Sequence, residues 1–136
     1  MKLRPCLSTR NPYALSKHRY YELKHFCLQY PEWKKMYYML EPAAKSHSLI
    51  KVRKDIYMQD LYDAAVLRAD LKRNIEMVER VCRNTDAIMH KWIFLAVTDG
   101  ANYTRLKQVY DIPCGKDLFY SYVRKFYYLL SLEKGL

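Results

Sequence analysis

Two histidines and two cysteines near the amino end have side chains that bind zinc, but their spacing is wrong for a zinc site. His25 and Cys27 are two positions apart, and Cys6 and His18 come earlier in the chain. A zinc site normally pairs its ligands as C-x₂₋₄-C or H-x₃₋₅-H, because such a pair can close on one ion. Neither pair occurs. The sequence therefore predicts neither a metal site nor a cofactor.

Two pairs of titratable residues stand at helical spacing, which is also the spacing of ordinary surface charges. They are Asp60 with Asp63 and Asp86 with His90. No nucleophile stands beside a base, and the glycine-rich phosphate-binding motifs, G-x-S-x-G and H-E-x-x-H are absent. The chain is therefore predicted not to be an enzyme and to have no catalytic residue.

The last helical segment, about residues 116–131, has an apolar side and a polar side. Each residue of a helix is rotated by about 100° from the one before, so Phe119, Val123, Phe126 and Leu130 share the core side. The other side carries donors, acceptors and flat rings, which can contact DNA in the major groove. With one lysine of the preceding helix, the residues expected to contact DNA are Lys107, Lys116, Asp117, Tyr120, Ser121, Arg124, Lys125 and Tyr128.

These side chains divide into two roles. Lys107, Lys116 and Lys125 suit phosphate contacts, together with backbone amides at the helix starts. Base reading falls to Asp117, Ser121 and Arg124, with Tyr120 as a further candidate, and Arg124 is the best suited to pair with guanine through two hydrogen bonds. A mixed polar face is also what any solvated helix has, so an ordinary helical bundle remains the alternative.

A helix-turn-helix would position this face. Asn102 can cap a short helix that carries Leu106, and a tight apolar turn with Ile112 as its buried plug leads into the last helix. Gly115 allows a bend beside the plug. Upstream, Asp86 is expected to open another helix, which Gly100 ends.

The first half also reads as helices. The pattern predicts one from Ser16 to about Gln29, with Tyr20, Leu23, Cys27 and Tyr30 on one side, and a short one from Pro31 that ends before Pro42. Residues 43–52 read as a connection. Residues 55–83 lack glycine and proline and form one long helix, with Glu76–Arg80 and Glu79–Arg83 as ion pairs. Its apolar stripe is Leu61, Ala64, Leu67 or Arg68, Leu71, Ile75, Val78 and Cys82, which suits either a bundle core or a homodimer.

Aromatic and basic residues alternate densely in the first two helices, as in Tyr20, Tyr21 and Lys24. Such rings form a core or stack on unpaired bases, and both interpretations stay open, with the core favoured for most of them. A clearer basic patch for phosphate or acidic-protein contact consists of Lys45, Lys51, Arg53 and Lys54.

Composition sets the class of protein. The 136 residues carry a net charge of +10, which favours a polyanionic partner. No apolar run is long enough for a membrane span or a signal peptide, so we expect reduced thiols and a cytoplasmic location. The prediction is one all-α domain over 1–136, a five-helix bundle with a long central helix and a C-terminal helix-turn-helix. Its parts are a basic arm (1–12), a basic aromatic part with the long helix (13–83) and the helix-turn-helix part (86–132).

Residues 87–131 resemble the C-terminal halves of small phage and prophage proteins of Gram-positive bacteria, the ArpU and RinA groups of late transcription regulators. The resemblance rests on Tyr103, Leu106, Ile112, Tyr120 and Arg124, and the turn at Pro113 is longer than in that family. It implies a sigma-like helix-turn-helix and a transcription regulator that binds double-stranded DNA in the cytoplasm of the bacterial host cell. The alternative is a phage-encoded, anti-CRISPR-type inhibitor of a host defence complex, which would bind a protein or ribonucleoprotein partner instead of free DNA.

Overall fold

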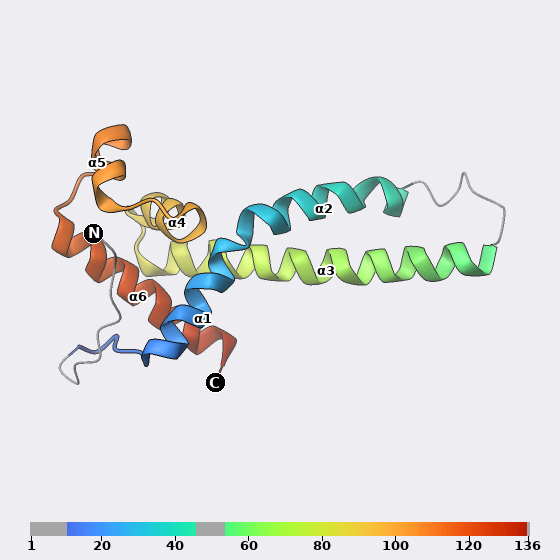
Figure 1. Cartoon of the computed structure of the whole chain (residues 1–136), viewed down its shortest axis with the longest axis horizontal. Coiled ribbons are helices and arrows are strands. Elements are labelled where there is room, and N and C mark those ends of the chain that lie inside the picture. Colours follow the sequence, from blue (N-terminus) through green and yellow to red (C-terminus); the bar gives the residue numbers. More distant parts are fainter. Residues whose placement is uncertain (1–10, 46–53, 136) are drawn as a thin grey trace. The chain divides into compact units, whose positions relative to one another are not determined.

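The computed structural model describes residues 11–45 and 54–135, with side chains described at 11–40 and 60–135. The all-α prediction is confirmed. Within the described residues there are six helices, one more than the five of the predicted bundle (Figure 1). The helices are α1 (Lys17–Leu28), α2 (Tyr30–Lys45), α3 (Lys54–Thr85), α4 (His90–Asp99), α5 (Tyr103–Tyr110) and α6 (Lys116–Lys134).

The chain divides into two compact units. Unit 1 holds the described residues of 1–29 and 77–136, and unit 2 holds residues 30–76. The division falls inside α3, whereas the sequence predicts one domain whose parts meet at residues 83–86. A helix is continuous in its own hydrogen bonds, so its sequence carries no mark of a change in the partners that pack against it.

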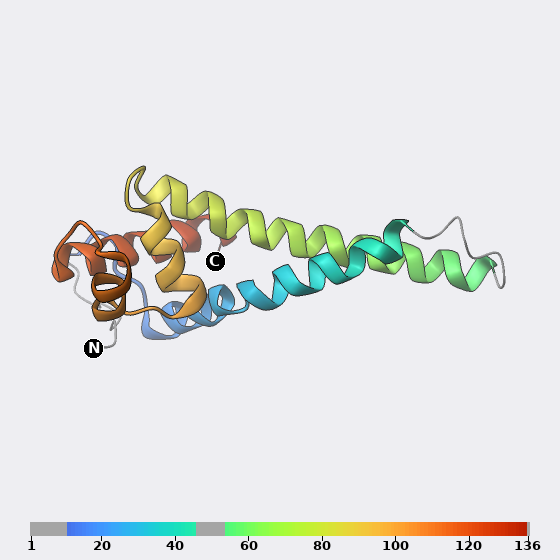
Figure 2. The ribbon, with the colours of Figure 1, turned by 90° about the horizontal axis from the view of Figure 1, so that it is seen from above.

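In unit 1, α1, α4 and α6 pack on one another, and Figure 2 shows them gathered with the carboxyl-terminal end of α3. Both predicted apolar stripes are confirmed. On α1, Tyr20, Leu23 and Cys27 are buried, and on α6 the four predicted core residues are joined by Tyr127. Each stripe recurs every three or four residues, so it forms one continuous face that leaves water when the helices meet. The core of this unit is therefore built on the helical period of the sequence.

Three predicted helix ends are also confirmed. The Ser16 hydroxyl accepts from the backbone N–H of Arg19 at 3.2 Å, and the Asn102 side chain accepts from that of Arg105 at 2.9 Å. Gly100 ends α4 in the left-handed region, at φ 71°. A side chain at Gly100 would be strained there, because L-residues rarely adopt positive φ.

The start of α4 differs from the prediction. Asp86 caps a turn, not the helix: its carboxylate accepts from the backbone N–H groups of Ile88 at 2.9 Å and Met89 at 2.8 Å, and α4 begins only at His90. These two bonds lower the pKa of Asp86 below its usual value, because they stabilise the ionised form. An aspartate in the sequence shows that backbone amides nearby need an acceptor. A tight turn has such amides as well as a helix start does, so Asp86 does not by itself fix where α4 begins.

In unit 2, α2 runs beside residues 54–76 of α3 in the opposite direction (Figures 1 and 2). Arg68 links them: its guanidinium lies 3.8 Å from the centre of the Tyr37 ring, and its Nε donates to the Tyr37 carbonyl at 3.3 Å. Of the two alternatives for this position of the stripe, Arg68 is thus half-buried and Leu67 is exposed. α2 also continues past Pro42 to Lys45, since proline removes one donor but keeps a helical φ.

The aromatic residues of the first half divide between the two open interpretations. Tyr20, Tyr30 and Trp33 are buried, whereas Tyr21 and Tyr38 are exposed. The core interpretation therefore holds for the first group only.

The predicted ion pair between Glu76 and Arg80 of α3 is replaced by two others. Arg80 pairs with Glu133 of α6, and Glu76 pairs with Lys72 at 3.8 Å. Spacing along a helix brings Glu76 within reach of either base, and the nearby carboxylate of another helix decides where the arginine goes.

The thiols of Cys27 and Cys82 are buried as expected, and Cys114 is half-buried. Burial raises the pKa of Cys82 to about 12 and that of Cys27 further, so both stay protonated at neutral pH. Across the described ranges, no three metal-binding side chains gather, and Cys6 lies outside those ranges. No described helix combines the length and apolar character that crossing a membrane requires.

Candidate nucleic-acid interface

Leu106 and Ile112 hold α5 to the turn that follows it. Both side chains are completely buried, and the backbone N–H of Ile112 donates to the Leu106 carbonyl at 3.4 Å. The expected apolar plug is therefore present. The chain reverses at Asp111, which ends α5 in the left-handed region at φ 49°. Aspartate tolerates this region better than most residues do.

Two further bonds tie the turn to the helices. The Tyr103 hydroxyl donates to the Cys114 carbonyl at 2.8 Å, and the Lys107 ammonium donates to the Ile112 carbonyl at 3.3 Å. Gly115 has an ordinary extended conformation, at φ −78°, and a Cβ there would meet no atom within 4 Å. The bend that the sequence assigns to Gly115 is thus made by Asp111, whose short polar side chain tolerates the left-handed region.

The first two turns of α6 present an open polar surface. Lys116, Asp117 and Ser121 are exposed there. Gly115 caps the helix without a side chain, so the first amides of α6 receive no side-chain acceptor. Free amides and a lysine at a helix start form an arrangement that suits a phosphate group.

The rest of the expected contact face is more enclosed. Tyr120, Arg124, Lys125 and Tyr128 are all half-buried. The Tyr120 hydroxyl accepts from the backbone N–H of Tyr103 at 3.4 Å, and the Tyr128 ring lies 5.5 Å from that of Tyr13. The open part of the face is therefore its amino-terminal half.

Arg124 is held inside the unit more than its type suggests. Its Nε atom is buried and has no hydrogen-bond partner among the described residues. Its positive charge acts on the Tyr20 hydroxyl and partly offsets the rise of that pKa caused by burial. Arg124 is therefore half-buried on the polar side of α6.

Unit 1 has the charge that a polyanion would require. Its described residues include twelve lysines and arginines and seven acidic residues, a difference of +5. Arg105, exposed on the first turn of α5 and 3.5 Å from Asp99, adds to this surface and was not predicted. Arg105 could have been found in the sequence, because it stands three residues after the Asn102 cap and therefore in the first turn of α5. The basic patch predicted at Lys45, Lys51, Arg53 and Lys54 lies outside the described side chains.

No protein-family model matches the chain, and neither a curated protein nor a solved structure matches it. The resemblance to the ArpU and RinA groups therefore stays a prediction from residues 87–131.

Proposed function

We propose that the chain is a sequence-specific double-stranded DNA-binding protein, a transcription regulator of a phage or mobile element, which docks the start of α6 in the major groove. The observation that carries the proposal is the pairing of a plugged α5–α6 turn with an open first half of α6. Helices of this kind contact base edges with their amino-terminal residues. The amino-terminal half of α6 is the exposed half.

The residues of this face take separate roles. Lys107 and Lys116 contact phosphates, and the free amides at the start of α6 support them. Asp117 accepts from the amino group of cytosine, and Ser121 bonds to more than one base. Lys125 and Arg124 lie one turn later, half-buried, and add positive charge beside the reading residues. Tyr120 and Tyr128 support the helix from the sides.

The test is selection of bound duplexes from a random-sequence pool at two salt concentrations, followed by sequencing. We expect one enriched motif, and an affinity that falls as salt rises because phosphate contacts release counterions. Weak binding without any motif would overturn the proposal.

Variants separate phosphate contact from base reading. Lys116→Ala should weaken binding to all duplexes alike and reduce the salt slope by about 1. Asp117→Ala with Ser121→Ala should relax the preferred sequence instead. Lys72→Ala is the matched control, because Lys72 is an exposed lysine of unit 2. An effect of the control equal to that of Lys116→Ala would show that binding reflects net charge alone.

The second candidate function is inhibition of a host defence complex through a protein or ribonucleoprotein partner. Apolar side chains exposed on unit 2 favour it: Met39 is 67% exposed and Tyr62 is 65% exposed. Apolar surface of this kind often marks a protein-binding face. An inhibitor need not bind free DNA, so the same selection experiment separates the two functions.

A further inference from the structure

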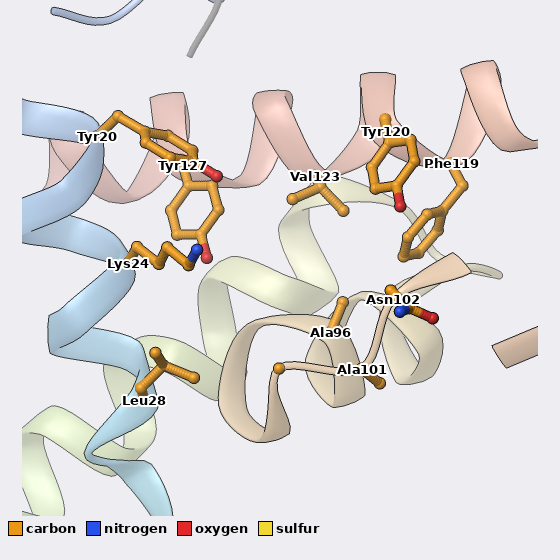
Figure 3. A pocket seen from close by; sticks show the side chains of 11 residues that line it. Tyr20, Lys24, Leu28, Ala96, Ala101, Asn102, Phe119, Tyr120, Val123 and Tyr127 are labelled. Atoms are coloured by element: carbon orange, nitrogen blue, oxygen red, sulfur yellow. The ribbon is translucent and has the colours of Figure 1, made fainter. Parts of the chain in front are cut away.

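Unit 1 contains a cavity of about 380 Å³ between α1, α4, α6 and the segment that leads into α5 (Figure 3). This volume lies within the range of small-molecule sites. Its walls include apolar side chains from three helices: Leu28 of α1, Ala96 of α4, and Val123 with Phe119 of α6. An apolar or aromatic body would therefore be in contact with carbon on several sides.

The polar side chains of the walls are three tyrosine hydroxyls, the Asn102 amide and the Lys24 ammonium, of which the ammonium can only donate. Lys24 is the only charged side chain among the described residues that line the cavity, and the lining includes no carboxylate. In Figure 3 the side chains of Lys24 and Tyr127 point into the cavity from α1 and α6. An ammonium beside a phenol hydroxyl in a partly apolar space attracts a negative group.

These two groups have capacity for a ligand. Within the described residues, the Lys24 ammonium has no carboxylate partner, and it lies 5.9 Å from the centre of the Tyr21 ring. No described residue accepts a hydrogen bond from Tyr127, whose hydroxyl keeps its proton because burial raises its pKa. Both can therefore donate to one acceptor.

A second positive charge lies next to the cavity. Arg124 follows the lining residue Val123, and its charge reaches the hydroxyl of Tyr20, which also lines the cavity. The carboxylate of Asp99, which precedes the lining residue Gly100, pairs with Arg105 at 3.5 Å, so no carboxylate of the lining opposes Lys24. The ammonium disfavours a cationic ligand, and a neutral ligand that accepts a hydrogen bond from it lacks the additional charge–charge attraction of an anion.

We propose that this cavity binds a small organic anion, an aromatic carboxylate whose ring packs against Val123, Ala96 and Leu28 and whose carboxylate accepts hydrogen bonds from Lys24 and Tyr127. One ammonium and one hydroxyl match the two oxygens of a carboxylate. The aromatic side chains of Tyr20, Phe119 and Tyr120 give edges and faces on which an aromatic ring can stack.

The site adjoins the candidate interface. Asn102, the cap of α5, and Tyr120 of α6 both belong to its walls. If the ligand changes the affinity for DNA, then DNA must change the affinity for the ligand by the same factor. This coupling rests on the proposed function, whereas ligand binding itself does not.

The experiment titrates the full-length protein with three probes that share a naphthalene ring: 2-naphthoate, 2-naphthamide and 2-naphthylmethylamine. Isothermal titration should give a Kd of about 1 mM or lower for 2-naphthoate, and at least about tenfold weaker binding of the other two. Equal affinity for the amide, preference for the amine, or no binding of 2-naphthoate would overturn the proposal.

Variants locate the site. Lys24→Met should remove the preference for the acid over the amide, and Tyr127→Phe should reduce it several-fold, while binding of the amide persists. Lys17→Met and Tyr128→Phe are the matched controls, because these residues do not line the cavity. Unchanged 2-naphthoate binding by folded Lys24→Met would overturn the assignment of the carboxylate. Ala96→Phe, which fills the cavity, should abolish binding of all probes, with circular dichroism to verify folding.

Two readouts separate this site from the proposed function. Probe binding is measured without DNA, and duplex affinity is then measured with and without 2-naphthoate. Probe binding without any duplex binding would leave the ligand site standing and overturn the DNA-binding proposal alone.

Discussion

Arg19 shows how one side chain of α1 completes a distant helix end. Its Nε donates to the Ser131 hydroxyl at 3.0 Å, and one terminal nitrogen donates to the Ser131 carbonyl at 3.2 Å and to the Gly135 carbonyl. The other terminal nitrogen pairs with Glu22 at 2.8 Å. The last carbonyls of a helix lack donors within that helix, so a guanidinium placed there supplies hydrogen bonds to them.

Arg19→Ala should therefore lower the free energy of unfolding by about 1–2 kcal/mol, because the Gly135 carbonyl and the Ser131 hydroxyl lose the arginine donor, whereas the Ser131 carbonyl keeps its bond from the Gly135 N–H. Arg19→Lys should recover only part of the loss, since an ammonium lacks the planar fork of donors. Urea denaturation measures both. Lys17→Ala, an exposed basic residue of the same helix turn, is the control, with an expected change within about 0.5 kcal/mol. Equal effects of Arg19→Ala and the control would contradict the role of Arg19 at the end of α6.

Asp86 gives a prediction about pH. Hydrogen bonds from the Met89 and Ile88 amides lower its pKa in the folded protein. A carboxyl with a lowered folded pKa adds stability that is present above the unfolded pKa, about 3.9, and is lost as pH falls through the folded value. Asp86→Ala should thus lower stability by about 1 kcal/mol at pH 7, and the difference from the unaltered protein should shrink below about pH 4.

The measurement is urea denaturation of both proteins at pH 7, 5 and 3. Asp60→Ala, which removes an exposed carboxylate of α3, serves as the control and should change little at any pH. A deficit of Asp86→Ala that stays constant down to pH 3 would show that the carboxylate is not the source of the stabilisation.

At the scale of elements, the α5–α6 pair depends on one buried side chain in its connecting turn. Ile112 is completely buried, whereas Val109, near the end of α5, is 63% exposed. Removing methyl groups from a buried site loses transfer free energy and leaves a cavity, and the same change on the surface does neither. The two residues therefore form a matched pair.

Ile112→Ala should destabilise the protein by about 2–4 kcal/mol, and Val109→Ala by less than about 0.5 kcal/mol. Thermal and urea denaturation test this directly. If the proposed function holds, Ile112→Ala should also weaken duplex binding at temperatures where most of the chain remains folded. A small loss of stability in Ile112→Ala would mean that the turn is not held by its plug.

At the scale of the whole molecule, charge and burial differ between the two units. The described residues of unit 1 have an excess of positive charge and a well-buried core. The described side chains of unit 2 carry equal numbers of basic and acidic groups and expose Met36, Met39, Tyr62 and Val66. Among the described side chains, those of unit 1 thus have the charge that suits a polyanion, and those of unit 2 offer apolar surface that suits a protein partner, a second copy of the chain included.

The same contrast predicts uneven stability along α3. In residues 78–84 of α3, the side chains of Val78, Val81 and Cys82 are buried. In residues 62–67, the side chains of Tyr62, Val66 and Leu67 are exposed. Local opening requires less free energy where fewer apolar contacts are broken. Hydrogen exchange should therefore be at least about tenfold faster at 62–67 than at 78–84, in dilute solution where self-association is minimal. Equal protection of the two segments in dilute solution would contradict the predicted difference in stability along α3.

The sequence alone determined the class of fold, most helix boundaries and the core stripes. Tyr20, Leu23 and Cys27 on α1, and Phe119, Val123, Phe126 and Leu130 on α6, were predicted because helical period and capping are local properties. The open first turns of α6 were within the predicted site for the same reason.

Only the tertiary structure decided what covers the opposite faces. Tyr128 meets Tyr13, Arg80 pairs with Glu133, and Lys24 and Tyr127 come together around a cavity, although each of these pairs is far apart in the chain. A helix has the same period whichever neighbour lies against it. The sequence pattern of a polar face in water is therefore the same as that of a polar face beside another helix, and only the folded structure distinguishes the two.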